Sequence, residues 1–202
     1  MIKLVVFDLD DTLYNEKEYV LSGFKAVANF LSKTTNIAPQ EIYAALVESF
    51  VLHGRGKNFE YFFEKYNLPK VDCDLLVKIY REHTPDIKLF VESELVLEHL
   101  KKKFTLAILT NGWEDAQRNK VFALKLGHYF DSIFFAQEKG LEFRKPDPRC
   151  FLNILRHYKF KPEEVLMVGD DLFSDIEGAD RLGFGAFHIR HQSDLLKLIH
   201  LY

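Results

Sequence analysis

Residues 4–12 of the chain read LVVFDLDDT, an apolar run that passes directly into a cluster of carboxylates. Two later stretches have the same form: residues 106–110 read LAILT, and residues 165–170 read VLMVGD. Short apolar runs separated by helix-like segments are typical of the buried strands of a parallel sheet. The ligand crevice of an open α/β sheet lies outside the carboxyl ends of its strands, so we expect the polar residues there to converge on one site. Those residues are Asp8, Thr110 and Asp170.

The chain after residue 91 alternates between strand-like and helix-like segments. The pattern predicts strands at 105–110, 133–135, 165–169 and 185–188, and helices at 92–103, 114–126, 147–158, 172–182 and 193–200. This alternation predicts an α/β fold, a Rossmann-like doubly wound parallel sheet with helices on both faces.

Residues 16–87 interrupt this alternation directly after the first strand. Apolar residues recur there at helical spacing, and no run resembles a strand. We therefore expect two domains. The α/β core domain comprises residues 1–15 and 88–202, and a small all-helical cap domain comprises residues 16–87.

Composition narrows the classes of partner. The 202-residue chain has a formal net charge of -3, which lacks the positive surplus of proteins that bind nucleic acid or anionic membranes. Its two cysteines, Cys73 and Cys150, are too few for a disulfide framework and favour a reducing compartment. The apolar run 4–7 is too short for a signal peptide or a membrane span. We expect a cytoplasmic protein with a small-molecule partner, and no nucleic acid polymer or membrane as partner.

The carboxylates at the strand ends predict a metal site. Asp8 and Asp10 are two residues apart in an extended segment, so their side chains face the same side. Carboxylates held this close repel one another unless one is protonated or a cation lies between them. With Asp170 arriving from another strand, the oxygen ligands suit Mg²⁺.

A carboxylate-rich site binds an anionic substrate only if other groups attract it. Thr110 and Asn111 supply a hydroxyl and turn N–H groups, and Lys145 supplies a cation. The chain has no glycine-rich loop of the kinds that bind nucleoside triphosphates or dinucleotides. This absence argues against nucleoside triphosphates or dinucleotides bound in those modes.

Four motifs occur in a fixed order along the chain: Asp8-x-Asp10-x-Thr12, Thr110-Asn111-Gly112, Lys145-Pro146 and Gly169-Asp170-Asp171-x-x-x-Asp175. With these motifs the chain resembles the haloacid dehalogenase superfamily of phosphohydrolases, in the subclass whose helical cap follows the first motif. The resemblance covers nearly the whole chain outside the cap. One departure is the link at residues 140–145, which is longer than usual before the motif lysine.

The resemblance implies a magnesium-dependent phosphatase that acts on small phosphate monoesters. Asp8 would be the nucleophile that forms an aspartyl-phosphate, and Asp10 the general acid and base. The resemblance also implies that Mg²⁺ is bound by Asp8, the backbone carbonyl of Asp10 and Asp170. Phosphate would be bound by Thr110, Asn111 and Lys145. The residues that would lie next to these groups and hold them in position are Thr12, Asp171 and Asp175.

Alternatives remain open from the sequence. A phosphosugar mutase would use the same aspartyl-phosphate, and a non-catalytic module could bind a phosphorylated ligand. Asp10 disfavours a dehalogenase, since a halide leaving group needs no acid. The substrate could be a sugar phosphate, a nucleotide or a similar metabolite. The cap loop 53–57 either reaches a second polar group of the substrate or is solvated, and Trp113 either stacks on a ligand or packs under the cap.

Overall fold

The computed structural model describes residues 1–69 and 73–202, and the chain divides into two compact units. The first unit comprises residues 1–16 and 87–202, and the second comprises residues 17–86. The domain boundaries expected from the sequence stay a prediction.

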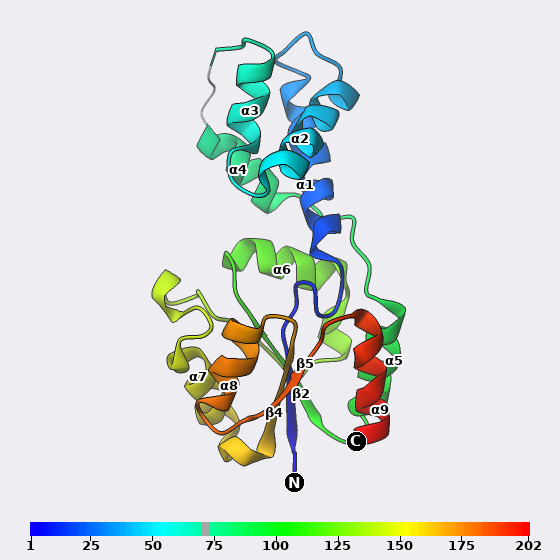
Figure 1. Cartoon of the computed structure of the whole chain (residues 1–202), viewed down its shortest axis with the longest axis vertical. Coiled ribbons are helices and arrows are strands. Elements are labelled where there is room, and N and C mark those ends of the chain that lie inside the picture. The colour runs from blue at the N-terminus through cyan, green and yellow to red at the C-terminus, as the bar shows by residue number, and fades with distance from the viewer. Residues whose placement is uncertain (70–72) are drawn as a thin grey trace. The chain divides into compact units, whose positions relative to one another are not determined.

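The first unit is built on a parallel five-stranded sheet with the order β3-β2-β1-β4-β5 (Figure 1). The strands are β1 (Leu4–Phe7), β2 (Thr105–Thr110), β3 (Ser132–Phe135), β4 (Val165–Gly169) and β5 (Gly185–His188). All the predicted strands are present. Since β1 lies in the middle, its carboxyl end is flanked by the ends of β2 and β4.

Helices cover both faces of the sheet. They are α5 (Val91–Leu100), α6 (Glu114–Ala123), α7 (Pro148–Tyr158), α8 (Gly178–Asp180) and α9 (Lys197–Leu201), with short turns η1 (Leu126–His128), η2 (Leu141–Phe143), η3 (Pro162–Glu164) and η5 (Gln192–Leu196). Helices α7 and α8 lie on one face, and α5 and α9 on the other (Figure 1). The prediction of a Rossmann-like doubly wound fold is confirmed.

The core explains why these strands are apolar throughout. Leu4 and Val6 of β1 pack in one cluster with Phe151 and Ile154 of α7, and all four side chains are fully buried. Alternate residues of a strand point to opposite faces, so Val5 and the other intervening residues face the opposite layer. Their complete burial accounts for the continuous apolar runs, as expected for a sheet covered on both sides.

The segment predicted as a helix at 172–182 differs from the prediction. Residues Leu172–Glu177 form a π-helix, η4, and only Gly178–Asp180 form the α-helix α8. The wider turn is visible in the hydrogen bond from the N–H of Ile176 to the carbonyl of Asp171. A π-turn inside a helix is a frequent feature of functional sites.

The second unit is helical in its described residues. Its helices are α1 (Glu16–Leu31), which begins in the first unit, α2 (Pro39–His53), α3 (Asn58–Lys65) and α4 (Cys73–Glu82). Phe24, Leu46, Phe62 and Leu76 come from these four helices and are almost fully buried in one cluster. The helical spacing predicted for this segment is therefore present.

Within residues 1–69 and 73–202, no helix combines the length and the apolar character that crossing a lipid bilayer requires.

Candidate active site

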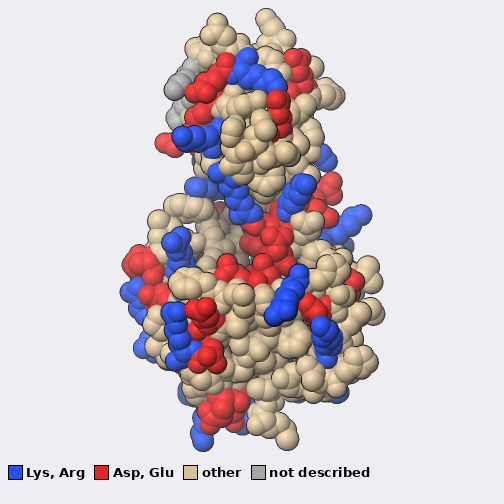
Figure 2. All heavy atoms as spheres, viewed as in Figure 1, with Lys and Arg blue, Asp and Glu red and all other residues tan. Residues whose placement is uncertain are grey.

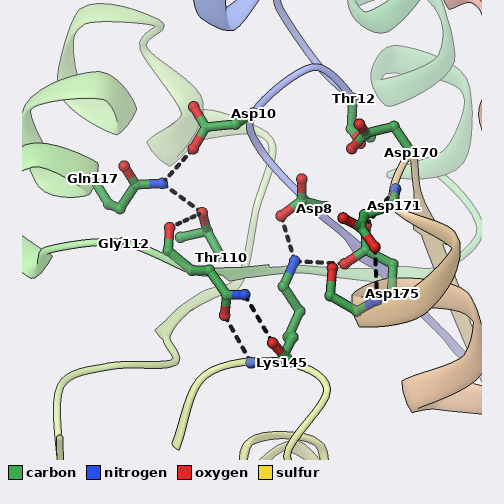
Figure 3. A network of polar contacts seen from close by, with 12 residues as sticks. Asp8, Asp10, Thr12, Thr110, Gly112, Gln117, Lys145, Asp170, Asp171 and Asp175 are labelled. Carbon is green, nitrogen blue, oxygen red and sulfur yellow. Dashed lines mark hydrogen bonds and ion pairs between the residues drawn. The ribbon is translucent and has the colours of Figure 1, made fainter. Parts of the chain in front are cut away.

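The strand register brings the predicted residues to one edge of the sheet. Phe7 of β1 lies opposite Ile108 of β2 and Val168 of β4. Asp8 follows Phe7, and its N–H donates to the carbonyl of Val168 at 2.8 Å. Thr110 and Asp170 lie at the corresponding ends of β2 and β4, and Figure 3 shows their side chains around Asp8.

Lys145 joins two carboxylates in the centre of this site. Its ammonium nitrogen lies 2.5 Å from Oδ1 of Asp8 and 2.6 Å from Oδ1 of Asp175 (Figure 3). Lys145 and Asp175 are 3% and 1% exposed, so the charges of this group interact with little screening by water. A cation paired this closely with Asp8 can also attract an anion that approaches Asp8.

Burial and charge shift the pKa values of this group. Burial would lower the pKa of Lys145, but the carboxylates of Asp8 and Asp175 together raise it above its usual value. The pKa of Asp8 is raised well above its usual value, chiefly by burial, against the opposing effect of Lys145. A carboxyl with a raised pKa is stabilised as its anion by any further cation that binds nearby.

A second feature of the site is a set of three carboxylates that fits a metal ion. One oxygen from each of Asp8, Asp170 and Asp175 lies within 4.8 Å of the others. Burial, followed by the charge of Asp175, raises the pKa of Asp170 to about 6, although the Thr12 hydroxyl donates to its Oδ1 at 3.1 Å. Crowded oxygen donors of this kind suit a hard divalent cation such as Mg²⁺. Figure 2 shows Asp and Glu side chains gathered at this end of the first unit.

The segment after β4, which includes η4, brings Asp175 to the site. The carboxylate of Asp171 accepts hydrogen bonds from the N–H groups of Phe173 and Ser174, so it caps the start of η4. The N–H of Asp171 in turn donates to Oδ2 of Asp175 at 3.2 Å. Gly169 leaves room for Asp175, because a Cβ atom at that position would lie 2.2 Å from its Oδ2.

Asn111 holds the loop that carries Lys145. Its amide nitrogen donates to the carbonyl of Lys145 at 3.1 Å, and its side-chain oxygen accepts from the Lys145 N–H at 2.8 Å. Both ends of the amide are therefore engaged by one residue. The link before Lys145 contains the single turn η2 (Leu141–Phe143).

Sequence reasoning did not assign the residues that contact Asp10. The Nζ atom of Lys120 lies 2.7 and 3.0 Å from the two carboxylate oxygens, and Nε2 of Gln117 donates to Oδ2 at 2.8 Å. The hydroxyl of Tyr14 donates to Oδ1. Gln117 and Lys120 are three residues apart, which places them on one face of α6, and that spacing was the available signal.

Three further features of the described residues are a cavity in the first unit, Trp113 and the loop 53–57. A cavity of about 490 Å³ opens beside Asp170 and is lined also by Asp11, His188 and Arg190. Trp113 precedes α6 and is 51% exposed. The loop 53–57 lies between α2 and α3, and its residues are exposed.

Comparison with known proteins identifies one family over most of the chain. The family model for haloacid dehalogenase-like hydrolases matches residues 5–189. The chain is 29% identical to the glyceraldehyde 3-phosphate phosphatase of Methanopyrus kandleri, over 94% of this chain and 84% of that protein. It is 31% identical to the protein of the same name from Pyrococcus furiosus, over 90% of this chain and 78% of that protein.

A solved structure extends the likeness to the fold. The putative HAD-hydrolase YfnB from Bacillus subtilis, solved bound to magnesium, has a TM-score of 0.72 and 20% identity, and the match covers 98% of each chain. The prediction of a phosphohydrolase of this type is confirmed by the family model and the named relatives. The match over residues 5–189 and the shared fold show that the chain belongs to the haloacid dehalogenase-like hydrolases.

Proposed function

We propose that the protein is a magnesium-dependent phosphatase that hydrolyses small phosphate monoesters through an aspartyl-phosphate on Asp8. The observation that carries this proposal is the position of Lys145, whose ammonium group lies 2.5 Å from Asp8. A buried carboxylate beside a buried cation, at the carboxyl edge of a parallel sheet, suits attack on an anionic centre.

The first step forms a bond between a carboxylate oxygen of Asp8 and phosphorus, and breaks the bond from phosphorus to the alcohol oxygen. Lys145 and Thr110 bind the phosphate oxygens, on which charge is concentrated in the transition state. Asn111 keeps Lys145 in place through its two hydrogen bonds to the Lys145 backbone.

Asp10 transfers the protons in both steps. It gives a proton to the departing alcohol oxygen, and then takes one from the water that attacks the aspartyl-phosphate. The second step releases inorganic phosphate and restores the carboxylate of Asp8. A single carboxyl thus serves as acid and then as base.

Mg²⁺ would be held by Asp8, Asp170 and the backbone carbonyl of Asp10. The residues that would lie next to these ligands and hold them in position are Thr12, Asp171 and Asp175. Bound Mg²⁺ neutralises charge on the phosphate and lessens its repulsion by the carboxylates. The proximity of the Asp8 and Asp170 oxygens supports this assignment, and the third carboxylate of the cluster, Asp175, pairs with Lys145. Asp10 contributes only its backbone carbonyl because its carboxylate is bound by α6.

The proposed substrate class is supported by the names of the relatives. Those named above are glyceraldehyde 3-phosphate phosphatases, and others are named phosphoserine phosphatase and phosphoglycolate phosphatase. All three names describe phosphate esters of small alcohols. We propose that a small cytoplasmic metabolite of this kind is the substrate, and that the helical segment 16–87 acts as a cap domain that limits access to larger esters.

The test is phosphate release with and without a metal ion. The purified protein is incubated with p-nitrophenyl phosphate in MgCl₂ and in EDTA, and then with glyceraldehyde 3-phosphate, phosphoserine, phosphoglycolate, sugar phosphates and nucleoside monophosphates. Release that requires magnesium and favours one small ester supports the proposal. Absence of release from every ester contradicts it and favours a phospho-ligand-binding module. Conversion of a hexose 1-phosphate to its 6-phosphate without release identifies a mutase.

A further inference from the structure

The carboxylate of Asp10 is held by side chains from two different segments. Lys120 of α6 contacts both carboxylate oxygens, at 2.7 and 3.0 Å, and Gln117 of α6 contacts Oδ2 at 2.8 Å. Tyr14 donates to Oδ1 from the loop that follows Asp10 itself. Contacts on both oxygens fix the direction of the carboxylate plane as well as its position.

These contacts are shielded from solvent. Gln117 is 1% exposed and Lys120 is 3% exposed, which is rare for a lysine unless it is paired. Burial, followed by the charge of Asp10, raises the pKa of Tyr14 above its ordinary range, so its hydroxyl keeps the proton that it donates. A second carboxylate, Glu16, lies 3.9 Å from the Lys120 ammonium group.

Gln117 also connects Asp10 to the residue proposed to bind phosphate. Its Nε2 atom lies 2.8 Å from Oδ2 of Asp10 and 2.6 Å from Oγ1 of Thr110 (Figure 3). A primary amide has two N–H groups, so one nitrogen can donate to both oxygens. The separation between the carboxyl of Asp10 and the hydroxyl of Thr110 is therefore set by one buried side chain.

We propose that Gln117 and Lys120 are positioning residues for proton transfer by Asp10. They set the carboxyl of Asp10 relative to the phosphate held at Thr110, so that it meets the oxygen of the departing alcohol. This inference rests on the proposed phosphatase function. A positioned acid matters most when the leaving group is a strong base. The loss of either residue therefore lowers the rate of hydrolysis selectively for esters of weakly acidic alcohols.

The experiment compares benzyl phosphate with p-nitrophenyl phosphate, two esters of similar size. The first releases a basic alkoxide that requires a proton, and the second releases a stable phenolate that does not. We use kcat/KM because it reports steps only up to departure of the alcohol, and so excludes the later role of Asp10 as base. The ratio of the two kcat/KM values does not depend on the fraction of folded protein, so partial misfolding of a variant does not disturb it.

The variants are Lys120→Met and Gln117→Leu, with Asp10→Asn as reference. We expect each to lower kcat/KM for benzyl phosphate by roughly 10- to 100-fold and that for p-nitrophenyl phosphate by less than about threefold. Lys120→Arg retains the cation and should restore much of the ratio. In the Asp10→Asn background, Lys120→Met should leave the ratio unchanged, because Lys120 acts through Asp10.

Arg118→Met is the matched control on the same helix. Arg118 pairs with Glu114 and lies over the ring of Phe135, so the ratio should equal that of the wild type. An equal loss for both esters in Lys120→Met and Gln117→Leu, or no loss, overturns the inference while the phosphatase function stands. A wild-type protein that hydrolyses neither these esters nor the metabolite panel overturns the proposed function, and the inference with it.

Discussion

The ammonium nitrogen of Lys145 lies 2.6 Å from Oδ1 of Asp175, and the two side chains are almost completely shielded from solvent. Lys145 comes from the loop before α7 and Asp175 from η4, and the same ammonium group also pairs with Asp8. One buried cation therefore compensates two buried carboxylates, so removal of that cation has consequences for both stability and activity.

The Lys145→Met variant should lose stability. Without the ammonium group, Asp8 and Asp175 lack their compensating charge, which costs about 3 kcal/mol of unfolding free energy. Urea unfolding in EDTA near neutral pH measures this loss, and added MgCl₂ should restore part of it. Lys139→Met, at an exposed lysine, should change stability by less than about 0.5 kcal/mol. Equal stability of the two variants would mean that the pairing contributes nothing.

The Asp8→Asn variant should lose turnover with every ester. An amide is not a nucleophile toward phosphorus and cannot form the acyl phosphate. The activity is measured as phosphate release under the conditions of the wild-type assay, with Asp115→Asn, at an exposed position of α6, as the matched control. Retention of half of the wild-type rate by Asp8→Asn would refute covalent catalysis by Asp8.

The Gly169→Ala variant tests the packing of Asp175. The added Cβ would lie 2.2 Å from Oδ2 of Asp175, so the Asp175 side chain, which pairs with Lys145, or the backbone beside it must shift. We expect a loss of about 1–3 kcal/mol in unfolding free energy, together with lower kcat/KM. Gly127→Ala is the control, because its Cβ meets nothing within 4 Å. Similar behaviour of the two alanine variants would show that this close approach is unimportant.

The raised pKa of Asp170 predicts how stability depends on pH in the absence of metal. The native pKa of about 6 exceeds the ordinary aspartate pKa of 3.8, so the folded protein binds this proton more tightly than the unfolded chain does. The stabilisation is complete below pH 3.8 and is lost as the pH rises through about 6. After allowance for partial exposure, the loss is about 2 kcal/mol.

Asp170→Asn isolates this contribution, since the amide does not titrate. In EDTA, the unfolding free energy of the wild type minus that of the variant should fall between pH 4 and pH 7 by roughly this amount. Added Mg²⁺ should stabilise the wild type more at pH 7 than at pH 4, because a cation binds the ionised carboxylates. Parallel pH profiles of the two proteins would contradict the prediction.

Much of the fold could be predicted because its local patterns and its long-range contacts agree. The run 4–7 is apolar at every position, as a central strand covered on both faces requires, and it forms β1 between β2 and β4. The segment 172–182 was less predictable, since a helical period does not distinguish an α-turn from a π-turn. In that segment, the wider π-turn occurs together with an Asp175 side chain that points into the site.

The sequence by itself determined the sheet, the helical insertion and the edge at which Asp8, Thr110 and Asp170 meet, because strand burial and strand ends follow from the order of apolar and polar residues. Only the tertiary structure decided which way the Asp10 carboxyl points and which cation contacts it. Lys120 is 110 positions away in the sequence. The rotation of α6 about its axis is set by packing against the rest of the unit, and no local pattern encodes it.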